Sequence, residues 1–271
     1  MDKVRSICWD WTQEDIEFLA QFGIKIPKPG LERFEIPEDE CYFKIRERFE
    51  KQWGNSRIND CRGFKYSKED LTSSKYCILR GMNICGYPQP ELDYIGNYYQ
   101  YDLSSYCPRC GTGLEQTDDF RINKVPKRNF WGFCSWINDV LFAKEDFYKE
   151  VFEPLGIGCR PVRMVSGKIR EGVVQIEIPV IDEELNLEGH PYYLCPECGR
   201  KQYTCAILYP FFPLHKNPLP HLYLSKEYFG SGPSADRKIF ISTELALQLI
   251  KLKELKDYYL IPCKKGLKIE V

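Results

Sequence analysis

The chain has 271 residues, of which 43% are hydrophobic and 28% are charged, and its formal net charge is -1. These proportions exclude a disordered chain, and the near-zero net charge argues against nucleic-acid binding through bulk charge. No apolar run is long enough for a membrane span, and Met1 to Ser6 lack the apolar core of a signal peptide. We therefore expect a cytoplasmic protein with no membrane partner.

The N-terminal part of the chain predicts two helices. Thr12 to Asp15 form a capping box, and the apolar face that follows has helical spacing as far as Gly23. A second helix is expected to begin near Pro37, where acidic residues are followed by apolar residues at spacings of three and four: Tyr42, Ile45, Phe49 and Trp53. A cap signal from Ser67 to Asp70 predicts one further helical turn.

A short buried strand is expected at residues 76–79, followed by a long ordered loop over residues 86–106. The loop is rich in Tyr, Pro, Gly and Asn, and its tyrosines are Tyr94, Tyr98, Tyr99 and Tyr101. Such an aromatic loop either forms a binding surface or packs onto its own domain, and the sequence leaves both alternatives open.

Two stretches predict a strand, a helix and a second strand, at residues 139–164 and 239–261. The first helix ends at Pro154 and Gly156, and the second begins after Ser242, a good N-cap. Residues 173–178 alternate as a half-exposed strand does, and residues 229–233 resemble a tight turn more than a phosphate loop. The two units indicate either an internal duplication or the independent occurrence of a common unit.

Each unit follows a knuckle of the form Cys-Pro-x-Cys-Gly, at residues 107–111 and 195–199. The proline restricts the turn, and the glycine permits the positive φ that directs backbone N–H groups toward thiolate sulfurs. Two knuckles supply four soft ligands and leave no position for water, as in structural zinc sites. We therefore predict one structural Zn²⁺ bound by four thiolates: Cys107, Cys110, Cys195 and Cys198.

Three other chemistries compete for these cysteines. Iron and iron–sulfur centres also use four thiolates, although zinc is favoured for an isolated tetrahedral all-sulfur site. A thioredoxin-like dithiol would need the motif at the start of a helix, and no helical pattern follows either knuckle. Two disulfides would require an oxidising compartment.

The remaining nine cysteines are interpreted as buried free thiols that act as small hydrophobic side chains. They are Cys8, Cys41, Cys61, Cys77, Cys85, Cys134, Cys159, Cys205 and Cys263. His190, five residues before the second knuckle, is expected on a surface loop, with a supporting or ligand role as the alternative. We find none of the common catalytic motifs: no Ser/His/Asp order, no zinc-protease helix and no evident pair of carboxylates. We therefore expect no enzymatic activity.

Acidic residues gather in two places. One group comprises Glu35, Glu38, Asp39 and Glu40, and the other comprises Glu177, Asp182, Glu183, Glu184 and Glu188. Such clusters are either solvated surface or faces that steer a basic partner. We favour the second group as a partner-binding surface, because it lies next to the second knuckle.

The paired knuckles and the C-terminal strand–helix–strand resemble the double-CXXCG motif family of bacterial proteins, over about residues 100–263. The residues that carry this resemblance are Cys107, Cys110, Gly111, Cys195, Cys198, Gly199 and Ser242. The segment from Arg237 to Cys263 also resembles the end of related immunity proteins of polymorphic toxin systems. The resemblance implies a cytoplasmic antidote that binds and blocks a cognate toxin domain.

These observations predict an α+β fold of mixed sheets with flanking helices, stapled by a zinc-ribbon-like four-cysteine site. We expect an N-terminal mixed region at 1–100 and a zinc-stapled domain at 101–271, which together could form one compact unit. The expected function is that of a non-catalytic immunity protein with a toxin partner. The alternative is a zinc-ribbon-like module that binds nucleic acid or regulates it, which the net charge disfavours.

Overall fold

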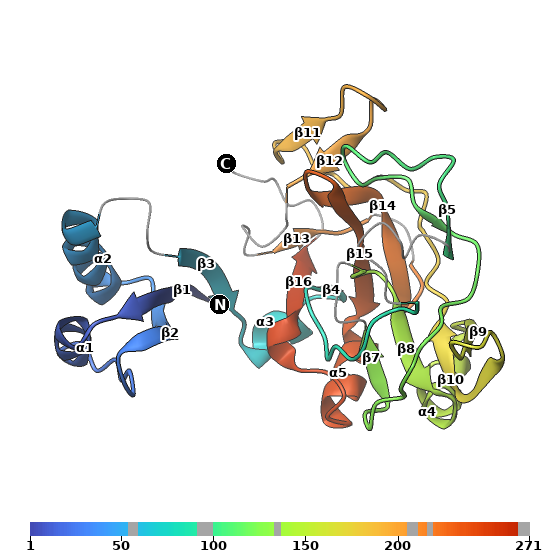
Figure 1. The fold of residues 1–271 in the computed structure, drawn as a ribbon, viewed down its shortest axis with the longest axis horizontal. Coiled ribbons are helices and arrows are strands. Elements are labelled where there is room, and N and C mark those ends of the chain that lie inside the picture. Colours follow the sequence, from blue (N-terminus) through green and yellow to red (C-terminus); the bar gives the residue numbers. More distant parts are fainter. Residues whose placement is uncertain (54–58, 91–99, 133–136, 205–210, 216–218, 265–271) are drawn as a thin grey trace. The chain divides into compact units, whose positions relative to one another are not determined.

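The computed structural model describes residues 1–53, 59–90, 100–132, 137–204, 211–215 and 219–264 (Figure 1). The fold is α+β, as expected. The chain forms two compact units, Met1–Ser67 and Lys68–Val271. The boundary therefore falls between Ser67 and Lys68 and not near residue 100, because the strand at residues 76–79 pairs within the second unit.

The first unit is a three-stranded antiparallel sheet with two helices. Its elements are β1 (Asp2–Trp11), α1 (Gln13–Ala20), β2 (Gly30–Pro37), α2 (Glu40–Trp53) and β3 (Asn59–Lys65). The strand order is β2-β1-β3. Both predicted helices are confirmed, and Thr12 and Asp15 form the predicted capping box of α1. The three strands were not predicted, because their alternating charged residues conceal the apolar face.

One apolar core holds the first unit together. Trp11 of β1 contacts Phe49 of α2 at a ring-centroid separation of 5.3 Å, and both side chains are buried with Leu19 and Ile45. The buried ring of Tyr42 joins this core, and its hydroxyl donates a 2.6 Å hydrogen bond to Asp60 of β3. The helical spacing in α2 therefore corresponds to a real buried face.

The second unit contains two large sheets. Its helices are α3 (Lys68–Thr72), α4 (Glu145–Val151), α5 (Thr243–Lys251) and the short 3-10 helices η2 (Glu153–Leu155) and η4 (Asp257–Tyr259). Its strands are β4 (Tyr76–Leu79), β5 (Tyr101–Asp102), β6 (Glu115–Gln116), β7 (Phe130–Gly132), β8 (Leu141–Lys144), β9 (Cys159–Arg163), β10 (Ile169–Ile176), β11 (Tyr192–Leu194), β12 (Lys201–Tyr203), β13 (Phe212–Pro213), β14 (Leu222–Ser231), β15 (Ser234–Ser242) and β16 (Leu260–Lys264).

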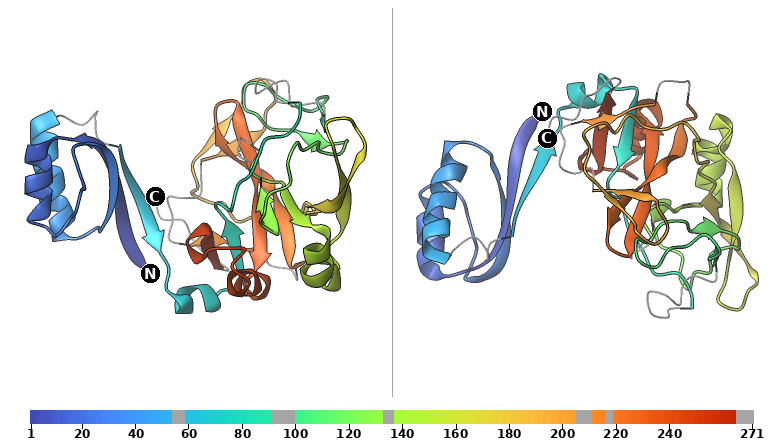
Figure 2. Two further views of the ribbon diagram at one scale, coloured as in Figure 1. Left: turned by 60° about the horizontal axis from the view of Figure 1, so that its bottom comes forward. Right: turned by 90° about the horizontal axis from the view of Figure 1, so that it is seen from above.

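The sheet orders are β7-β8-β10-β9 and β11-β12-β14-β15-β4-β16-β13. The second sheet is mixed, since β12 pairs with β14 and β13 with β16 in parallel, whereas its other pairs are antiparallel. β4, coloured teal, lies among the orange and red strands of this sheet in both views of Figure 2.

The order of elements in the second unit occurs twice. The first half runs β4, knuckle, β7, β8, α4, η2 and β9, and the second half runs β10, knuckle, β14, β15, α5, η4 and β16. In each half the helix begins directly after the second strand of a hairpin, which is β7–β8 in the first half and β14–β15 in the second. Helix α4 packs on β8 and β10, and helix α5 packs on β15 and β4. The repetition is what an internal duplication predicts.

The two halves exchange their first strands. β4 of the first half lies between β15 and β16, whereas β10 of the second half lies between β8 and β9. The registers match: Ile78 pairs with Ile261 of β16, and Gln175 pairs with Arg160 of β9. Ile78 and Gln175 are therefore equivalent positions, as are Ile261 and Arg160.

Two further contacts follow the same equivalence. Trp131 of β7 stacks on Phe142 of β8, and Tyr223 of β14 stacks on Phe240 of β15, with ring centroids 5.9 and 4.7 Å apart. After the exchanged strand, the chain of each half pairs again with a strand of its own half through an isolated parallel bridge. In the first half Ile84 pairs with β7, and in the second half Val180 pairs with β14. The exchange locks the halves into a single unit.

Most strands predicted for the second unit are confirmed. The strand at residues 76–79 is β4, and Ser242 caps α5 by accepting a hydrogen bond from the Leu245 amide. The predicted turn at 229–233 is shorter, because β14 extends to Ser231. Three tyrosines of the predicted loop, Tyr94, Tyr98 and Tyr99, lie outside the described residues.

Candidate metal centre

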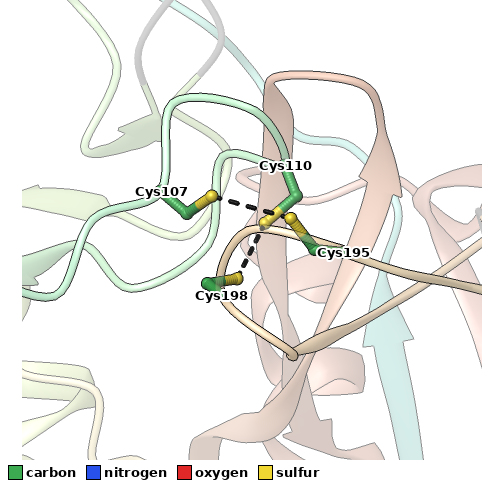
Figure 3. A group of neighbouring side chains, drawn as sticks. All are labelled: Cys107, Cys110, Cys195 and Cys198. Atoms are coloured by element: carbon green, nitrogen blue, oxygen red, sulfur yellow. Dashed lines mark hydrogen bonds between the residues drawn. The ribbon is translucent and has the colours of Figure 1, made fainter.

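The two knuckles occupy equivalent places in the two halves. The first lies between β5 and β6, and the second lies between β11 and β12. Each turn is closed by the same backbone bond: the Gly111 N–H donates to Cys107 O at 2.8 Å, and the Gly199 N–H donates to Cys195 O at 2.9 Å. The short antiparallel pairs β5–β6 and β11–β12 thus hold two matching turns open toward each other (Figure 3).

Both glycines have the positive φ that the motif predicts, 69° at Gly111 and 70° at Gly199. Their surroundings differ. A Cβ atom on Gly111 would lie 2.3 Å from the carbonyl oxygen of Pro233, whereas a Cβ atom on Gly199 would meet open space. The first knuckle therefore packs tightly on the turn between β14 and β15.

The four sulfur atoms lie within 4.8 Å of one another. Cys107 Sγ is 3.7 Å from Cys195 Sγ, and Cys110 Sγ is 3.6 Å from Cys198 Sγ (Figure 3). Four thiolates at ~2.3 Å from one tetrahedral ion would be about 3.8 Å apart. The set therefore fits one mononuclear ion, and the predicted grouping of the four cysteines is confirmed.

Equivalent cysteines face each other across the centre, with Cys107 opposite Cys195 and Cys110 opposite Cys198. The centre thus relates the two halves symmetrically. Three of the four cysteines are buried, and Cys198 is half-buried. Water has little access to such a closed set of sulfurs, which is the arrangement of structural metal sites.

Backbone groups prepare at least one thiol for metal binding. Burial acts to raise the pKa of Cys195, but backbone hydrogen bonds from Cys198 and Glu197 outweigh it and lower the pKa to about 7. Burial raises the pKa of Cys110 to about 12, against a hydrogen bond with the Thr112 hydroxyl. A cation among the sulfurs would favour the thiolate form of both.

Polar side chains fasten the knuckles to their surroundings. The buried Gln202 amide donates to the carbonyl oxygen of Cys110 at 2.9 Å and to those of Gly232 and Ser234 at 3.0 Å. Arg200, after the second knuckle, donates to Ser105 O before the first at 2.6 Å. The two halves are therefore tied together around the sulfurs as well as through them.

The geometry argues against three of the competing chemistries: disulfides, a thioredoxin-like dithiol and an iron–sulfur cluster. The 3.6 and 3.7 Å sulfur separations are too long for disulfides, and the cysteines are free. Neither knuckle begins a helix, as a thioredoxin-like dithiol would require, because β6 and β12 follow them. An iron–sulfur cluster would distribute the four thiolates over two or four irons, and sulfurs on different irons would lie further apart than the 4.8 Å that encloses this set.

Two predictions about other residues were wrong. His190 is buried, not on a surface loop, and its Nε2 lies 3.0 Å from Thr204 O while its ring packs on Tyr203. Cys41 and Cys61 are exposed, not buried. Cys77 and Cys263 are buried as predicted, and burial raises the pKa of both thiols. Cys134 and Cys205 lie outside the described residues.

The acidic residues favoured as a partner surface do not form one cluster. Asp182 and Glu184 share the ammonium group of Lys226, at 2.9 and 4.0 Å. Glu183 is half-buried and Glu188 is exposed, whereas Glu177 borders a cavity beside β10. The segment is held by β14, through the Leu185 N–H and Glu227 among other contacts, and not by the knuckle.

Sequence reasoning missed an aromatic edge beside the centre. Tyr192, Tyr193 and Leu194 of β11 are 50, 41 and 57% exposed, and β11 is an edge strand of the seven-stranded sheet. Part of the signal was present in the sequence: Ser104 and Ser105 stand before the first knuckle where Tyr192 and Tyr193 stand before the second, whereas Tyr106 and Leu194 are both large. We call Tyr192–Leu194 the β11 edge.

Comparison with known proteins gives no assignment: the chain matches no family model, no curated protein and no solved structure. Within the part of the chain that the structure describes, no helix has both the length and the apolar character needed to cross a membrane. The four cysteines form a centre that could hold one metal ion.

Proposed function

We propose that this chain is a non-catalytic immunity protein of the cytoplasm, which binds a cognate toxin domain and holds a structural zinc ion at its four cysteines. Two knuckles of matching geometry support the zinc, because four thiolates satisfy a tetrahedral ion and leave no position for a substrate or water. The resemblance of the knuckle pair to the double-CXXCG family supports the toxin partner.

The observation that carries the binding role is the β11 edge. Three large side chains in a row are exposed there, and tyrosines at such sites commonly provide much of the binding energy of protein interfaces. The strand enters Cys195 directly, so the metal centre would hold it rigid and reduce the entropy lost on binding. Lys201 Nζ lies 4.7 Å from the ring centroid of Tyr192, which further fixes that side chain.

A co-expression assay tests this proposal. The product of the adjacent gene, taken as the candidate toxin, is produced alone, with the wild-type chain, and with the double variant Tyr192→Ala, Leu194→Ala. We expect the wild-type chain to restore growth and the double variant to protect poorly. Tyr258→Ala is the matched control, because Tyr258 is also exposed, at 52%, but lies on η4.

Metal content separates loss of binding from loss of folding. The double variant should retain the same zinc content as the wild-type chain, because neither residue is one of the four ligands. Failure of the wild-type chain to protect against the neighbouring toxin would overturn the immunity proposal. Salt-dependent binding to DNA or RNA by the purified chain would favour the nucleic-acid alternative instead.

A further inference from the structure

A cavity of about 760 Å³ lies between the two halves of the second unit, beside β10. Its apolar floor includes Ile176, Leu222 and Leu224. Arg160 and Arg237 also line it. Its volume is in the range of pockets that hold small organic ligands.

The internal repeat supplies a control for this cavity. A smaller cavity, of about 230 Å³, lies at the equivalent place in the other half. Its wall includes Ile78 and Ile261, which are both 1% exposed, and the equivalent residues in the large cavity are Gln175 and Arg160. The fold accommodates an apolar pair at these positions, so the polar pair is not required by the sheet.

Placing polar groups at such positions lowers stability unless they find partners. Gln175 does find one: its amide and that of Gln116 exchange hydrogen bonds of 2.9 and 2.7 Å. Arg160 does not, because its guanidinium forms no hydrogen bond or ion pair with any described residue, and its Nε atom is buried. A guanidinium in this situation is suited to receive a carboxylate.

Charges of both signs surround the cavity. Arg237 stacks on Tyr228 at 4.7 Å, and its buried Nε has no partner among the described residues. The carboxylates of Glu115, Asp139 and Glu177 also border the cavity and form no ion pair with a described residue. Carboxylates that line the same cavity as the arginines would repel a multiply charged anion such as phosphate, whereas they would attract an ammonium group.

We propose that this cavity binds a small zwitterion of the amino-acid or short-peptide class. Its carboxylate contacts the arginine side of the cavity, its ammonium group contacts Asp139 or Glu177, and its apolar body lies on the floor. This binding site does not depend on the proposed immunity function, since neither the four cysteines nor the β11 edge contributes to it.

Ligand-observed NMR with the full-length protein tests the proposal, using leucyl-leucine at millimolar concentration as the probe. N-acetyl-leucyl-leucine lacks the ammonium group, and leucyl-leucine amide lacks the carboxylate. We expect the dipeptide to bind and each blocked form to bind at least roughly tenfold more weakly, because each loses one charge-assisted contact. Inorganic phosphate should not compete.

The informative variant is Arg160→Ile, which installs the residue found at the equivalent position of the other half. We expect it to keep the melting temperature of the wild-type chain and to lose dipeptide binding by about tenfold or more. Arg170→Ile removes the same charge from β10 outside the cavity and should bind normally. Absence of dipeptide binding by the wild-type chain, or unchanged binding by Arg160→Ile, would overturn the proposal.

Discussion

The Sγ atoms of Cys107 and Cys195 lie 3.7 Å apart, although 88 positions of the chain separate these two residues. A metal ion that joins them closes a loop containing most of the first half of the second unit. Loop-closure entropy increases only slowly with loop length, so this distance along the chain is no obstacle. Metal binding would therefore contribute directly to the free energy of folding.

Replacing one ligand should weaken the whole second unit. We expect Cys198→Ser to lower the free energy of unfolding by about 3 kcal/mol or more, because three thiolates hold zinc poorly and the two halves lose their link. Denaturant unfolding together with metal analysis measures this effect. Cys61→Ser, at an exposed thiol outside the site, is the control and should change neither quantity. An unchanged stability of Cys198→Ser would contradict a stapling role.

The two knuckle glycines provide a matched pair. Gly111→Ala and Gly199→Ala both place a side chain at a positive φ, which costs roughly 1 kcal/mol in each case. Only at Gly111 does the new Cβ atom collide with a backbone carbonyl, that of Pro233. We expect Gly111→Ala to lose a further 1–3 kcal/mol or so in urea unfolding. Equal losses in the two variants would show that the first knuckle does not pack on the hairpin turn as described.

Local signals in the sequence were sufficient for much of this architecture. The capping residues Thr12 and Ser242 and the apolar spacing of α2 and α5 correctly predicted the helices, because caps and periodicity act within a few residues. The matched knuckles predicted the four-cysteine group for the same reason. The strand exchange could not be predicted, because pairing of β4 with β15 and β16 joins residues that share no local pattern.

The surroundings of the acidic segment, residues 177–188, also depend on contacts between residues that are distant in the chain. Lys226, far along the chain from Asp182, neutralises part of the acidic segment only once β14 lies beside it. Likewise, the folded structure alone shows that the buried Nε of Arg160 has no described partner, and the strand registers alone show that Arg160 is equivalent to Ile261.

The half-buried Asp139 should make stability depend on pH. Burial and the neighbouring Asp236 raise its pKa from 3.8 to about 6, against the attraction of Arg237 and Lys238. The folded state thus binds this proton more tightly than the unfolded state, so stability is lost as the pH rises from about 4 to about 6. Thermal unfolding should show Asp139→Asn more stable than the wild-type chain at pH 7, by roughly 1–2 kcal/mol, and equally stable near pH 4.

A control keeps this comparison specific. Glu171→Gln removes a carboxylate from an exposed position on β10 and should leave the pH profile unchanged. If Asp139→Asn and the wild-type chain have the same dependence of stability on pH between pH 4 and pH 7, ionising Asp139 in the folded state costs no free energy. That result would contradict the prediction.

Charge reversal tests the steering role of the acidic segment. The side chain of Asp182 is 97% exposed and shares Lys226 with Glu184, so the positive charge of Lys226 offsets part of the negative charge of the segment. We expect Asp182→Lys with Glu184→Lys to slow toxin association by several-fold at low salt and to leave the dissociation rate nearly unchanged. Stopped-flow association at two salt concentrations measures this, and an unaltered rate would remove the segment from the binding surface.

X-ray absorption at the zinc edge of the purified full-length protein tests the central claim most directly. It reports both the element bound and the distances to its ligands. We expect one zinc ion per chain, surrounded by four sulfur atoms at ~2.3 Å, because both knuckles contribute to one site. Nitrogen or oxygen ligands, two zinc ions bound at separate knuckles, or iron in place of zinc would contradict a single structural zinc shared by the two halves.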